Sequence, residues 1–377
     1  MVLGPMHDAH PPHAIYRLVD ERSCLDAVLV MHSNRLGPSL GPCCFGGLGD
    51  AAQMSDFAIR QARSMTYRAA LSGLPFGGGC IVIRRPPAMF DRAALFRALG
   101  DGVEKREGKF VAWQGRGTDM LDMKDMACTT SHVAGIVPCI GTIGANTAPF
   151  LAKGVFNAMK AALTHRFGVG FDQVSVAVVG LGKAGFALCR LLHQEGASLI
   201  VKDEDESRMY LAERCFGARS LRRENILTAD VDILAPCSSQ IQISKKHVPW
   251  IKARIICGAS DDQLVTSDVA RLLAAREILY VPDFAANSGG MINAAAEYLN
   301  WTQAQADALI DALGSRVADI IHSARHEDLS PLEAAREMAG HMMTSNSLAN
   351  ANQAAGNGSR DVEGLSGHEA LHQAATG

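Results

Sequence analysis

Residues 174–203 read VSVAVVGLGKAGFALCRLLHQEGASLIVKD. The apolar run at 174–179 is typical of a strand that is buried on both faces of a parallel sheet. A glycine-rich turn follows, then an apolar-periodic helix over 186–194, and then a second strand over 198–201 that leads to Asp203. A strand, a glycine turn, a helix and a strand in this order predict a unit that binds a dinucleotide.

The glycines of this turn, Gly180-x-Gly182-x-x-Gly185, each meet a different geometric need. Gly180 makes the tight turn out of the strand, Gly182 lets a pyrophosphate come close to the backbone, and Gly185 lets the helix pack against the strand. The helix start, with Lys183 and Ala184, offers backbone N–H groups and a positive dipole to phosphates. We therefore expect the cofactor phosphates at this turn.

Asp203 lies 23 positions after Gly180, where an acidic residue hydrogen-bonds an adenosine ribose. Its carboxylate would repel a 2′-phosphate, which favours NAD over NADP, although Lys202 and Arg208 lie nearby and weaken this preference. The alternative role for Asp203 is that of a turn residue or helix N-cap. We expect the ribose contact, and hence NAD as the cofactor.

Apolar stretches that suit buried strands recur at 231–235, 255–257 and 278–281, and helical stretches separate them. The alternation of strand and helix predicts the α/β class with a doubly wound parallel sheet. We therefore expect a Rossmann dinucleotide-binding domain over residues 136–324.

The chain on either side of this domain is organised differently. A helix is expected over 54–71 and a buried strand at 81–83, so residues 1–135 are predicted to form a separate N-terminal α/β domain. A helix over 325–350 is expected to pack back on that domain. Residues 351–377 are rich in Asn, Ala, Gly and Ser, which predicts a disordered tail.

The composition fits two globular domains. Of the 377 residues, 48% are hydrophobic and 20% are charged, which supplies ample core material. The net charge of −3 and the lack of a long apolar run argue against nucleic-acid and membrane partners. The ten cysteines include no C-x₂-C pair, so we expect reduced thiols, no metal site and a cytoplasmic location.

Other stretches carry a resemblance to a known family. They are Leu36-Gly37-Pro38-Ser39-Leu40-Gly41, Met65-Thr66-Tyr67, Leu74-Pro75-Phe76-Gly77-Gly78-Gly79, Gly117-Thr118, Ala235-Pro236-Cys237, Cys257-Gly258-Ala259-Ser260-Asp261-Asp262-Gln263-Leu264 and PDFAANSGGMIN at 282–293. Together with GLGKAG, they resemble the amino-acid dehydrogenases specific for glutamate, leucine, phenylalanine and valine, most closely the leucine/valine/phenylalanine branch. The resemblance runs from about residue 15 to about residue 345.

The resemblance implies two α/β domains with a deep cleft, and an N-terminal domain that also mediates assembly into a homo-oligomer, a dimer or an octamer. It implies reversible oxidative deamination of a small, amino-acid-like substrate, with NAD taking the hydride. It also places Cys237, Gly258 and Asn287 among the cofactor-binding residues.

The resemblance implies three catalytic groups, and this chain departs from the family at all three. The family has a lysine for the substrate carboxylate, a lysine base and a proton-shuttling aspartate; the residues here are Arg68, Cys80 and Gly115. A guanidinium at position 68 can clamp a carboxylate bidentately. Asp119 and Asp122, just downstream, are the candidates to replace the missing carboxylate.

Cys80 has two interpretations. It serves as a base if its neighbourhood lowers the thiol pKa from the usual value of about 8.5. Otherwise it is a small buried hydrophobe beside a glycine loop. Two further departures are Leu151, where the family has a threonine against the nicotinamide amide, and Asp262, where the closest relatives usually have asparagine.

Side-chain recognition also differs from the family. The substrate-binding residues that the resemblance implies are Leu40, Gly41, Met65, Trp113, Met291 and Ala294. Trp113 replaces a typically small residue, so it fills the pocket and favours a small substrate, stacks on a flat one, or is a core tryptophan.

Three functions follow. We expect an NAD-dependent oxidoreductase of this family that acts at a C–N bond with altered catalytic residues, because the cofactor motif is intact. The first alternative is a catalytically inactive paralogue that keeps dinucleotide binding for regulation or assembly. The second is a non-redox enzyme that uses bound NAD.

Overall fold

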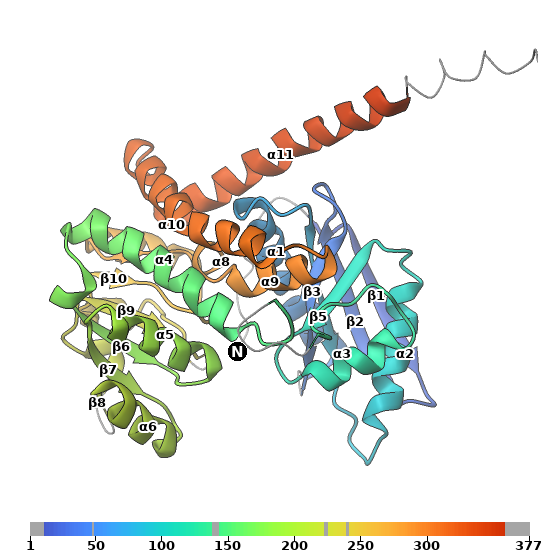
Figure 1. Ribbon diagram of the computed structural model, residues 1–377, viewed down its shortest axis with the longest axis horizontal. Coiled ribbons are helices and arrows are strands. Elements are labelled where there is room, and N and C mark those ends of the chain that lie inside the picture. Colours follow the sequence, from blue (N-terminus) through green and yellow to red (C-terminus); the bar gives the residue numbers. More distant parts are fainter. Residues whose placement is uncertain (1–10, 47–48, 138–142, 222–224, 239–240, 359–377) are drawn as a thin grey trace, which may run out of the picture.

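The structure, a computed structural model, describes residues 11–46, 49–137, 143–221, 225–238 and 241–358. It contains two separate β-sheets, each flanked by helices, with further helices between them (Figure 1). One sheet is mixed and the other is wholly parallel and wound in both directions, which confirms the predicted fold class.

The first sheet has five strands in the order β1-β2-β4-β3-β5. The strands are β1 (Ala14–Asp20), β2 (Leu25–Ser33), β3 (Ser39–Phe45), β4 (Gly77–Ile83) and β5 (Phe110–Gln114). β3 runs parallel to β4 and β5, whereas β2 pairs antiparallel with both β1 and β4. Helix α1 (Ala51–Leu71) covers one face, and α2 (Arg92–Glu104) and α3 (Met120–Ala127) cover the other.

Two sequence predictions in this domain need correction. α1 begins at Ala51 rather than residue 54, because Asp50 and Gln53 form a capping box. The glycine triplet is part of strand β4 and not a loop before it. A Cβ at Gly78 would lie 2.1 Å from the Thr66 nitrogen of α1, so the missing side chains let α1 lie close on the sheet.

The second sheet has six parallel strands in the order β11-β10-β9-β6-β7-β8. They are β6 (Ser175–Val179), β7 (Ser198–Lys202), β8 (Arg219–Ser220), β9 (Ile233–Pro236), β10 (Ile255–Ile256) and β11 (Leu279–Tyr280). The flanking helices are α4 (Ala148–Phe167), α5 (Lys183–Gln194), α6 (Glu206–Phe216) and α7 (Asp268–Ala275), with short 3₁₀ turns at Phe171–Gln173, Ile226–Thr228 and Val248–Trp250.

The order of this sheet reverses between β6 and β9, because the chain winds outward from β6 to β8 and then returns to continue from β9 to β11. The carboxyl ends of two strands on either side of such a reversal leave a crevice where open α/β sheets bind ligands. Gly180 follows β6 and Cys237 follows β9, so both lie at this crevice.

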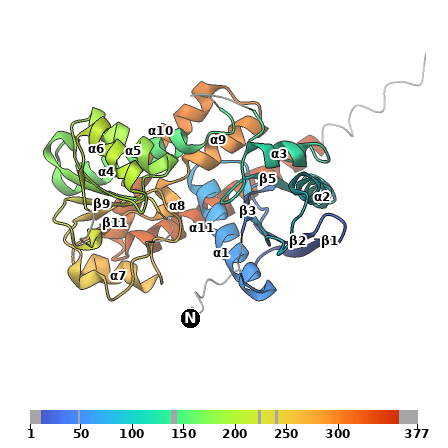
Figure 2. The same ribbon diagram turned by 90° about the horizontal axis from the view of Figure 1, so that it is seen from below.

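Four C-terminal helices complete the molecule: α8 (Asp283–Ala286), α9 (Gly289–Tyr298), α10 (Gln303–His326) and α11 (Pro331–Gly358). α1 and α8 lie between the two sheets (Figure 2). α9 and the start of α10 pack on the first sheet through Leu40 and Val111, and α11 packs against α1. The C-terminal segment that packs on the N-terminal domain therefore begins at α9, earlier than the predicted residue 325. The predicted domain boundary at about residue 135 remains a prediction.

The tail also differs from expectation. α11 continues as a helix to Gly358, so residues 351–358 are not irregular, and 359–377 lie outside the described part of the chain. Lengthening a helix that is already anchored needs no new nucleus, and the alanines and the glutamine of this stretch favour the helical conformation.

Candidate active site

A groove of about 980 Å³ lies outside the carboxyl ends of β6, β7 and β9. Gly180 and Gly182 form one wall, Asp203 and Arg208 a second, and Cys237 a third. The groove therefore occupies the crevice at the reversal of strand order and brings together residues predicted to bind the cofactor.

The glycine turn has the geometry that the sequence predicted. Gly180 has φ of 97°, a conformation that favours glycine, and a Cβ there would lie 2.7 Å from Cβ of Ser238. A Cβ at Gly185 would lie 1.9 Å from the Gly180 carbonyl oxygen, so only glycine lets α5 meet the strand end. A Cβ at Gly182 would meet nothing within 4 Å, so the backbone there is open to the groove.

Asp203 ties the end of β7 to the glycine turn. Its carboxylate accepts hydrogen bonds from the Leu181 nitrogen at 2.5 Å and the Asp205 nitrogen at 2.9 Å. Arg208 lies 3.8 Å away. A carboxylate has about four lone-pair positions, so Asp203 retains the capacity to accept from a ribose hydroxyl. Asp203 therefore also acts in part as a turn residue, which was the alternative role that the sequence offered for it.

A second cavity, the cleft, has a volume of about 500 Å³ and lies between the two domains. One wall is a face of α1 that carries Phe57, Arg60, Gln61, Met65 and Arg68, spaced three or four residues apart as on one side of a helix. The facing wall comes from the loop after β10 and from the residue that follows α8, and it includes Ala259, Ser260, Asp261, Asp262 and Asn287. Cys237 and Gln242 line both cavities, so the groove and the cleft adjoin.

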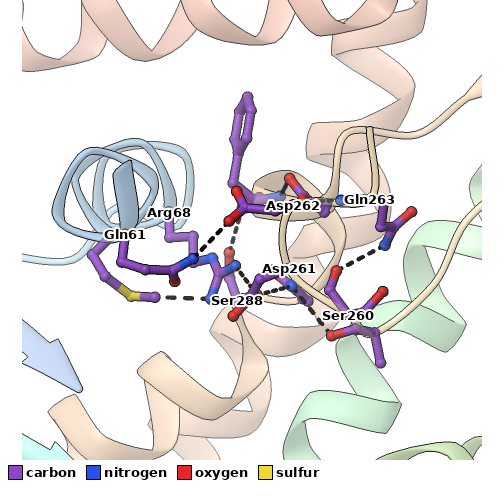
Figure 3. Close-up of polar contacts among 12 residues, drawn as sticks. Gln61, Arg68, Ser260, Asp261, Asp262, Gln263 and Ser288 are labelled. Carbon is purple, nitrogen blue, oxygen red and sulfur yellow. Dashed lines mark hydrogen bonds and ion pairs between the residues drawn. The ribbon is translucent and has the colours of Figure 1, made fainter. Parts of the chain in front are cut away.

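Arg68 connects the two walls of the cleft (Figure 3). Its guanidinium is buried and forms an ion pair with the Asp261 carboxylate across the cleft. Asn287 donates to the same carboxylate at 2.8 Å. Gln61 of α1 makes a second bridge by donating to Asp262 at 3.0 Å. Arg68 therefore already holds a carboxylate, and that carboxylate belongs to the protein.

Asp261 and Asp262 lie on this wall, and the buried Asp283 lies close enough to feel their charges. Burial and the charge of Asp261 raise the pKa of Asp262, while Arg60 and Arg68 oppose the rise. Burial and the charge of Asp262 raise the pKa of Asp283 to about 6. Asp262 also has φ of 51°, which is uncommon for a residue with a side chain. Strained backbone and raised carboxyl pKa values together are typical of functional sites.

Three of the predicted catalytic residues lie away from the cleft walls. Cys80 is fully buried among Val30, Ala62 and Val82. Asp119 caps α3 by accepting from the nitrogens of Leu121 and Asp122.

Asp122 is buried and ion-paired with Arg92 at 2.6 Å. It also accepts a hydrogen bond from the Asp119 nitrogen at 2.9 Å. Both aspartates are thus engaged in stabilising the start of α3, which gives them a structural task that the sequence position did not reveal. Of the four predicted catalytic residues, only Arg68 lines the cleft.

The residues predicted for side-chain recognition come together in one place. Leu40, Met65, Trp113, Met291 and Ala294 belong to a single buried apolar cluster.

Within this set, Met65 and Trp113 line the cleft. The indole N–H of Trp113 is buried and has no hydrogen-bond partner in the described ranges. Close packing of the strands explains the glycine at position 41, because a Cβ there would lie 2.2 Å from the carbonyl carbon of Gly79.

Sequence reasoning missed several residues of the cleft. Arg60 and Gln61 lie on the same face of α1 as Met65 and Arg68, so their helical spacing could have predicted that they line the cleft. Cys44 and Arg116 come together only through the pairing of β3 with β5, so no local pattern identifies them.

The residues present fit a dinucleotide. Asn287 is buried, and its Oδ1 has no hydrogen-bond partner among the residues that the structure describes, which leaves an acceptor for an amide N–H. The open backbone at Gly182 and the start of α5, with Lys183 and Ala184, suit phosphates. Gly258 packs so close to Pro236 that a Cβ would lie 2.1 Å from its carbonyl oxygen.

Within the described residues, no cluster of three or more His, Cys, Asp or Glu side chains suits a metal ion. The same residues contain no helix that is long and apolar enough to cross a membrane.

Comparisons with known proteins agree with this geometry. Residues 15–132 match the family model "Glu/Leu/Phe/Val dehydrogenase, dimerisation domain", and residues 201–356 match "Glutamate/Leucine/Phenylalanine/Valine dehydrogenase". The chain is 34% identical to leucine dehydrogenase of Geobacillus stearothermophilus over 321 residues, which cover 85% of this chain and 87% of the relative.

Solved structures of similar fold include L-tryptophan dehydrogenase from Nostoc punctiforme, with a TM-score of 0.76 at 29% identity, covering 89% of this chain and 96% of that one. Hetero-hexameric glutamate dehydrogenase from Thermus thermophilus shares the fold, with a TM-score of 0.70 at 18% identity and coverage of 89% of each chain.

Proposed function

The chain belongs to the glutamate/leucine/phenylalanine/valine dehydrogenase family, and we propose that it is an NAD-dependent oxidoreductase acting at the C–N bond of an amino-acid-like substrate with divergent catalytic residues. Curated relatives act on different amino acids, because their names include leucine, L-tryptophan and phenylalanine dehydrogenase. The family thus indicates the reaction class, and the residues of the cleft have to indicate the substrate.

The observation that carries the proposal is the junction of the two cavities. The groove holds the glycine turn and Asp203, and it meets the cleft at Cys237 and Gln242. Gly182 would hold the phosphates of a dinucleotide and Asp203 its adenosine ribose, and the free acceptor of Asn287 would suit a carboxamide. When bound, the nicotinamide supplies a hydride acceptor.

The cleft suits a substrate that carries a carboxylate. Arg60, Arg68 and Arg116 all line it, so three guanidinium groups face one cavity. Arg68 already forms an ion pair with Asp261, which lies on the opposite wall. A substrate carboxylate would replace Asp261 as this partner or share the guanidinium, since Arg68 can make bidentate contacts and its Nε has no partner among the described residues.

A fluorescence titration with NADH tests the first part of the proposal. We expect a dissociation constant in the micromolar range and weaker binding of NADPH, because Asp203 repels a 2′-phosphate. Gly182→Val is the matched control. A Cβ at this position contacts no other protein atom within 4 Å, so the valine side chain would occupy the groove without disturbing the fold. This variant should keep the thermal stability of the wild type and lose NADH binding. No NADH binding by the wild type would refute the proposal.

Turnover tests the second part. Amino acids are offered with NAD⁺, and 2-oxo acids with ammonia and NADH, while absorbance at 340 nm is followed. We expect poor turnover of leucine, valine, phenylalanine and glutamate, and turnover of an amino-acid-like substrate that suits Trp113 and the three arginines. Oxidation of those four at rates typical of the family would show that the chemistry has not diverged.

A second candidate function is a catalytically inactive paralogue that retains dinucleotide binding. The observation that favours it is the pairing of Arg68 with Asp261, which occupies the expected carboxylate clamp. NADH binding with no turnover across a broad amino-acid panel would support this candidate over the enzyme.

We also propose that the protein is a cytoplasmic homo-oligomer that assembles through its N-terminal domain. Residues 15–132 match a family model described as a dimerisation domain. Light scattering coupled to size-exclusion chromatography distinguishes a dimer or octamer from the 40.1-kDa monomer.

A further inference from the structure

The cleft holds few side chains that can exchange a proton near neutral pH. Among the described residues that line it, none is a histidine, a lysine or a glutamate, and the exchangeable groups are Asp261, Asp262, Cys44 and Cys237. The arginines stay protonated. Deamination needs an acid–base group, because the substrate nitrogen loses a proton before the hydride leaves and regains one before the C–N bond breaks. These four residues are therefore the candidates for that group.

Three of the four are poorly placed for this work. One oxygen of Asp261 is held by two donors, of which one is the Arg68 guanidinium. Burial raises the pKa of the Cys237 thiol to about 12, so this thiol keeps its proton. Cys44 is buried in the apolar cluster beneath α1, which leaves little of its sulfur to meet a ligand. Asp262 is the candidate that remains.

Asp262 is fixed from two sides and keeps one carboxylate oxygen open. Gln61 reaches it from α1 and donates to Oδ2 at 3.0 Å (Figure 3). Gln242 donates to its backbone oxygen, also at 3.0 Å. Oδ1 accepts no hydrogen bond from any residue that the structure describes. An anchored carboxylate with one open oxygen can accept a proton without giving up its position.

The two anchors also place Asp262 where substrate and cofactor would meet. Gln242 lines both the groove and the cleft, and Gln61 lies on the face of α1 that lines the cleft. Asp262 therefore lies beside the junction of the two cavities.

The opposite wall of the cleft offers no carboxylate among its described residues. Gly115 stands where the resemblance implies a proton-carrying aspartate, and a Cβ there would lie 2.7 Å from the Cys43 carbonyl oxygen. Asp119 and Asp122, just downstream, are engaged at the start of α3. The carboxylate of this cleft thus comes from the loop after β10 in the second domain.

Charged and titratable groups face Asp262 from its own loop and from three other elements. They are Asp261 on the loop, Arg60 and Arg68 on α1, Tyr280 on β11 and Asp283 on α8. Burial and the charge of Asp261 raise the pKa of Asp262, and this rise outweighs the opposing effects of the two arginines and of the hydrogen bond from Gln61. A raised pKa brings the carboxyl closer to the pH at which it can both take and return a proton.

We propose that Asp262 is the acid–base residue of this cleft, and that Gln61 and Gln242 are positioning residues that hold it beside the junction of the two cavities. The inference rests on the proposed function, because it assigns the proton transfers of deamination. The resemblance itself implies no carboxylate at this position.

The carboxylate first takes a proton from the substrate ammonium group. The lone pair of the resulting amine forms the C=N bond of an iminium ion while the α-hydrogen leaves as a hydride to NAD⁺. Water adds to the iminium carbon and releases one proton to solvent, and the Asp262 carboxylic acid returns its proton to the nitrogen. The C–N bond breaks with its electrons on nitrogen, and the hydroxyl proton leaves with ammonia as ammonium. The products are a 2-oxo acid, ammonium, NADH and one proton, and Asp262 is a carboxylate again.

Turnover by the full-length protein tests the assignment. The proteinogenic L-amino acids are offered with NAD⁺ while absorbance at 340 nm is followed, and the variants are compared on the amino acid that the wild type oxidises fastest. Asp262→Asn keeps an acceptor for Gln61 and a residue type that tolerates positive φ, so the loop should keep its shape. We expect kcat to fall by about 100-fold or more, with NADH affinity and thermal stability unchanged.

Formate separates a chemical role from a structural one. Asp262→Gly removes the carboxylate and suits the backbone, because the φ of 51° at this position favours glycine. Added formate should raise the kcat of this variant by about 10-fold or more in a saturable way, since the anion takes the vacated place and accepts the proton. Chloride at the same ionic strength is the control and should restore nothing.

The pH dependence gives a further readout. Deamination needs the carboxylate form, so the wild-type kcat should rise as the pH rises through the pKa of Asp262, and Asp262→Asn should lack this limb. The hydrogen bond from Gln61 stabilises the charged carboxylate and lowers its pKa, so Gln61→Met should move the limb to higher pH. A purely structural role for these residues would leave the limb where it is.

A kcat of Asp262→Asn within about 10-fold of the wild type would overturn the proposal, and so would a larger loss that formate does not restore in Asp262→Gly. Either result leaves the proposed function intact, because the wild type still turns over. NADH binding with no turnover by the wild type across the panel would instead favour the inactive paralogue, and would overturn this assignment together with the enzyme.

Discussion

Asp283 is the carboxyl group beneath the cleft, and its replacement by asparagine gives a quantitative test of the electrostatics. Burial and the neighbouring charge of Asp262 raise its pKa from 3.8 to about 6. Because each pKa unit corresponds to about 1.4 kcal/mol, the folded state holds this proton more tightly than the unfolded state by about 3 kcal/mol.

The sign follows from proton linkage. Well below the ordinary pKa of 3.8 the carboxyl is protonated in both states, and its contribution to stability is fully present. As the pH rises toward 6 the unfolded chain releases the proton first, so this contribution is lost, and above about pH 7 the loss is complete. Asp283→Asn cannot titrate. The free energy of unfolding of the variant minus that of the wild type should therefore rise by about 3 kcal/mol between pH 3 and pH 7.

Hydrogen bonds do not disturb this test. Asp283 accepts from the nitrogens of Phe284 at 2.7 Å and Gln263 at 3.3 Å, and an asparagine oxygen can keep only one of these bonds. That loss shifts the difference by an amount that hardly depends on pH, so the slope reports the titration alone.

The assay is urea unfolding followed by tryptophan fluorescence at a series of pH values. Asp268→Asn is the control of opposite sign, because hydrogen bonds from Lys245 and Thr266 lower the pKa of this exposed carboxyl. Its difference from the wild type should fall slightly as the pH rises. A difference for Asp283→Asn that stays flat from pH 4 to pH 7 would refute the inferred burial and charge of this site.

Three further outcomes are expected. Gly185→Ala should destabilise the protein by about 2 kcal/mol or more in thermal or urea unfolding, because its Cβ would lie 1.9 Å from a backbone oxygen; unchanged stability would contradict the tight turn. Asp203→Ser should narrow the preference for NADH over NADPH by about 10-fold in a fluorescence titration, since it removes the charge that repels a 2′-phosphate; an unchanged ratio would contradict the ribose assignment. Restoring the family residues with Cys80→Lys and Gly115→Asp should create no amino-acid dehydrogenase activity in the absorbance assay. Position 80 is fully buried, and a Cβ at Gly115 would lie 2.7 Å from the Cys43 carbonyl oxygen. A gain of activity would show that both strands can move to accept these side chains.

The geometry of the glycine turn and the place of Asp203 beside it could be predicted from sequence because their determinants are local. One strand, one turn, one helix and the next strand contain the glycine spacing and Asp203, and backbone geometry at Gly180 and Gly185 follows from the absence of a side chain. Boundaries were predicted less well. The cap at Asp50 lies outside the apolar pattern, and the glycine triplet belongs to a strand because it pairs with β2 and β3, which are distant in sequence.

The substrate half could be predicted only in part. The resemblance to the family implied that Arg68 lies in the cleft and that Trp113 and Met65 share a pocket, and the structure places these residues so. The sequence could not show that Asp119 and Asp122 are engaged at the start of α3, because a capping box becomes visible only when the helix start is known.

By itself, the sequence determined the α/β class and the glycine turn, since both are matters of residue identity or of short-range periodicity. The tertiary structure alone decided which groups meet in the cleft. Asp261 reaches Arg68 from 193 residues away, and Cys44 meets Cys80 and Arg116 because β3 lies between β4 and β5. Such contacts depend on how strands are ordered in a sheet and how two domains face each other, and no local pattern of residues encodes either.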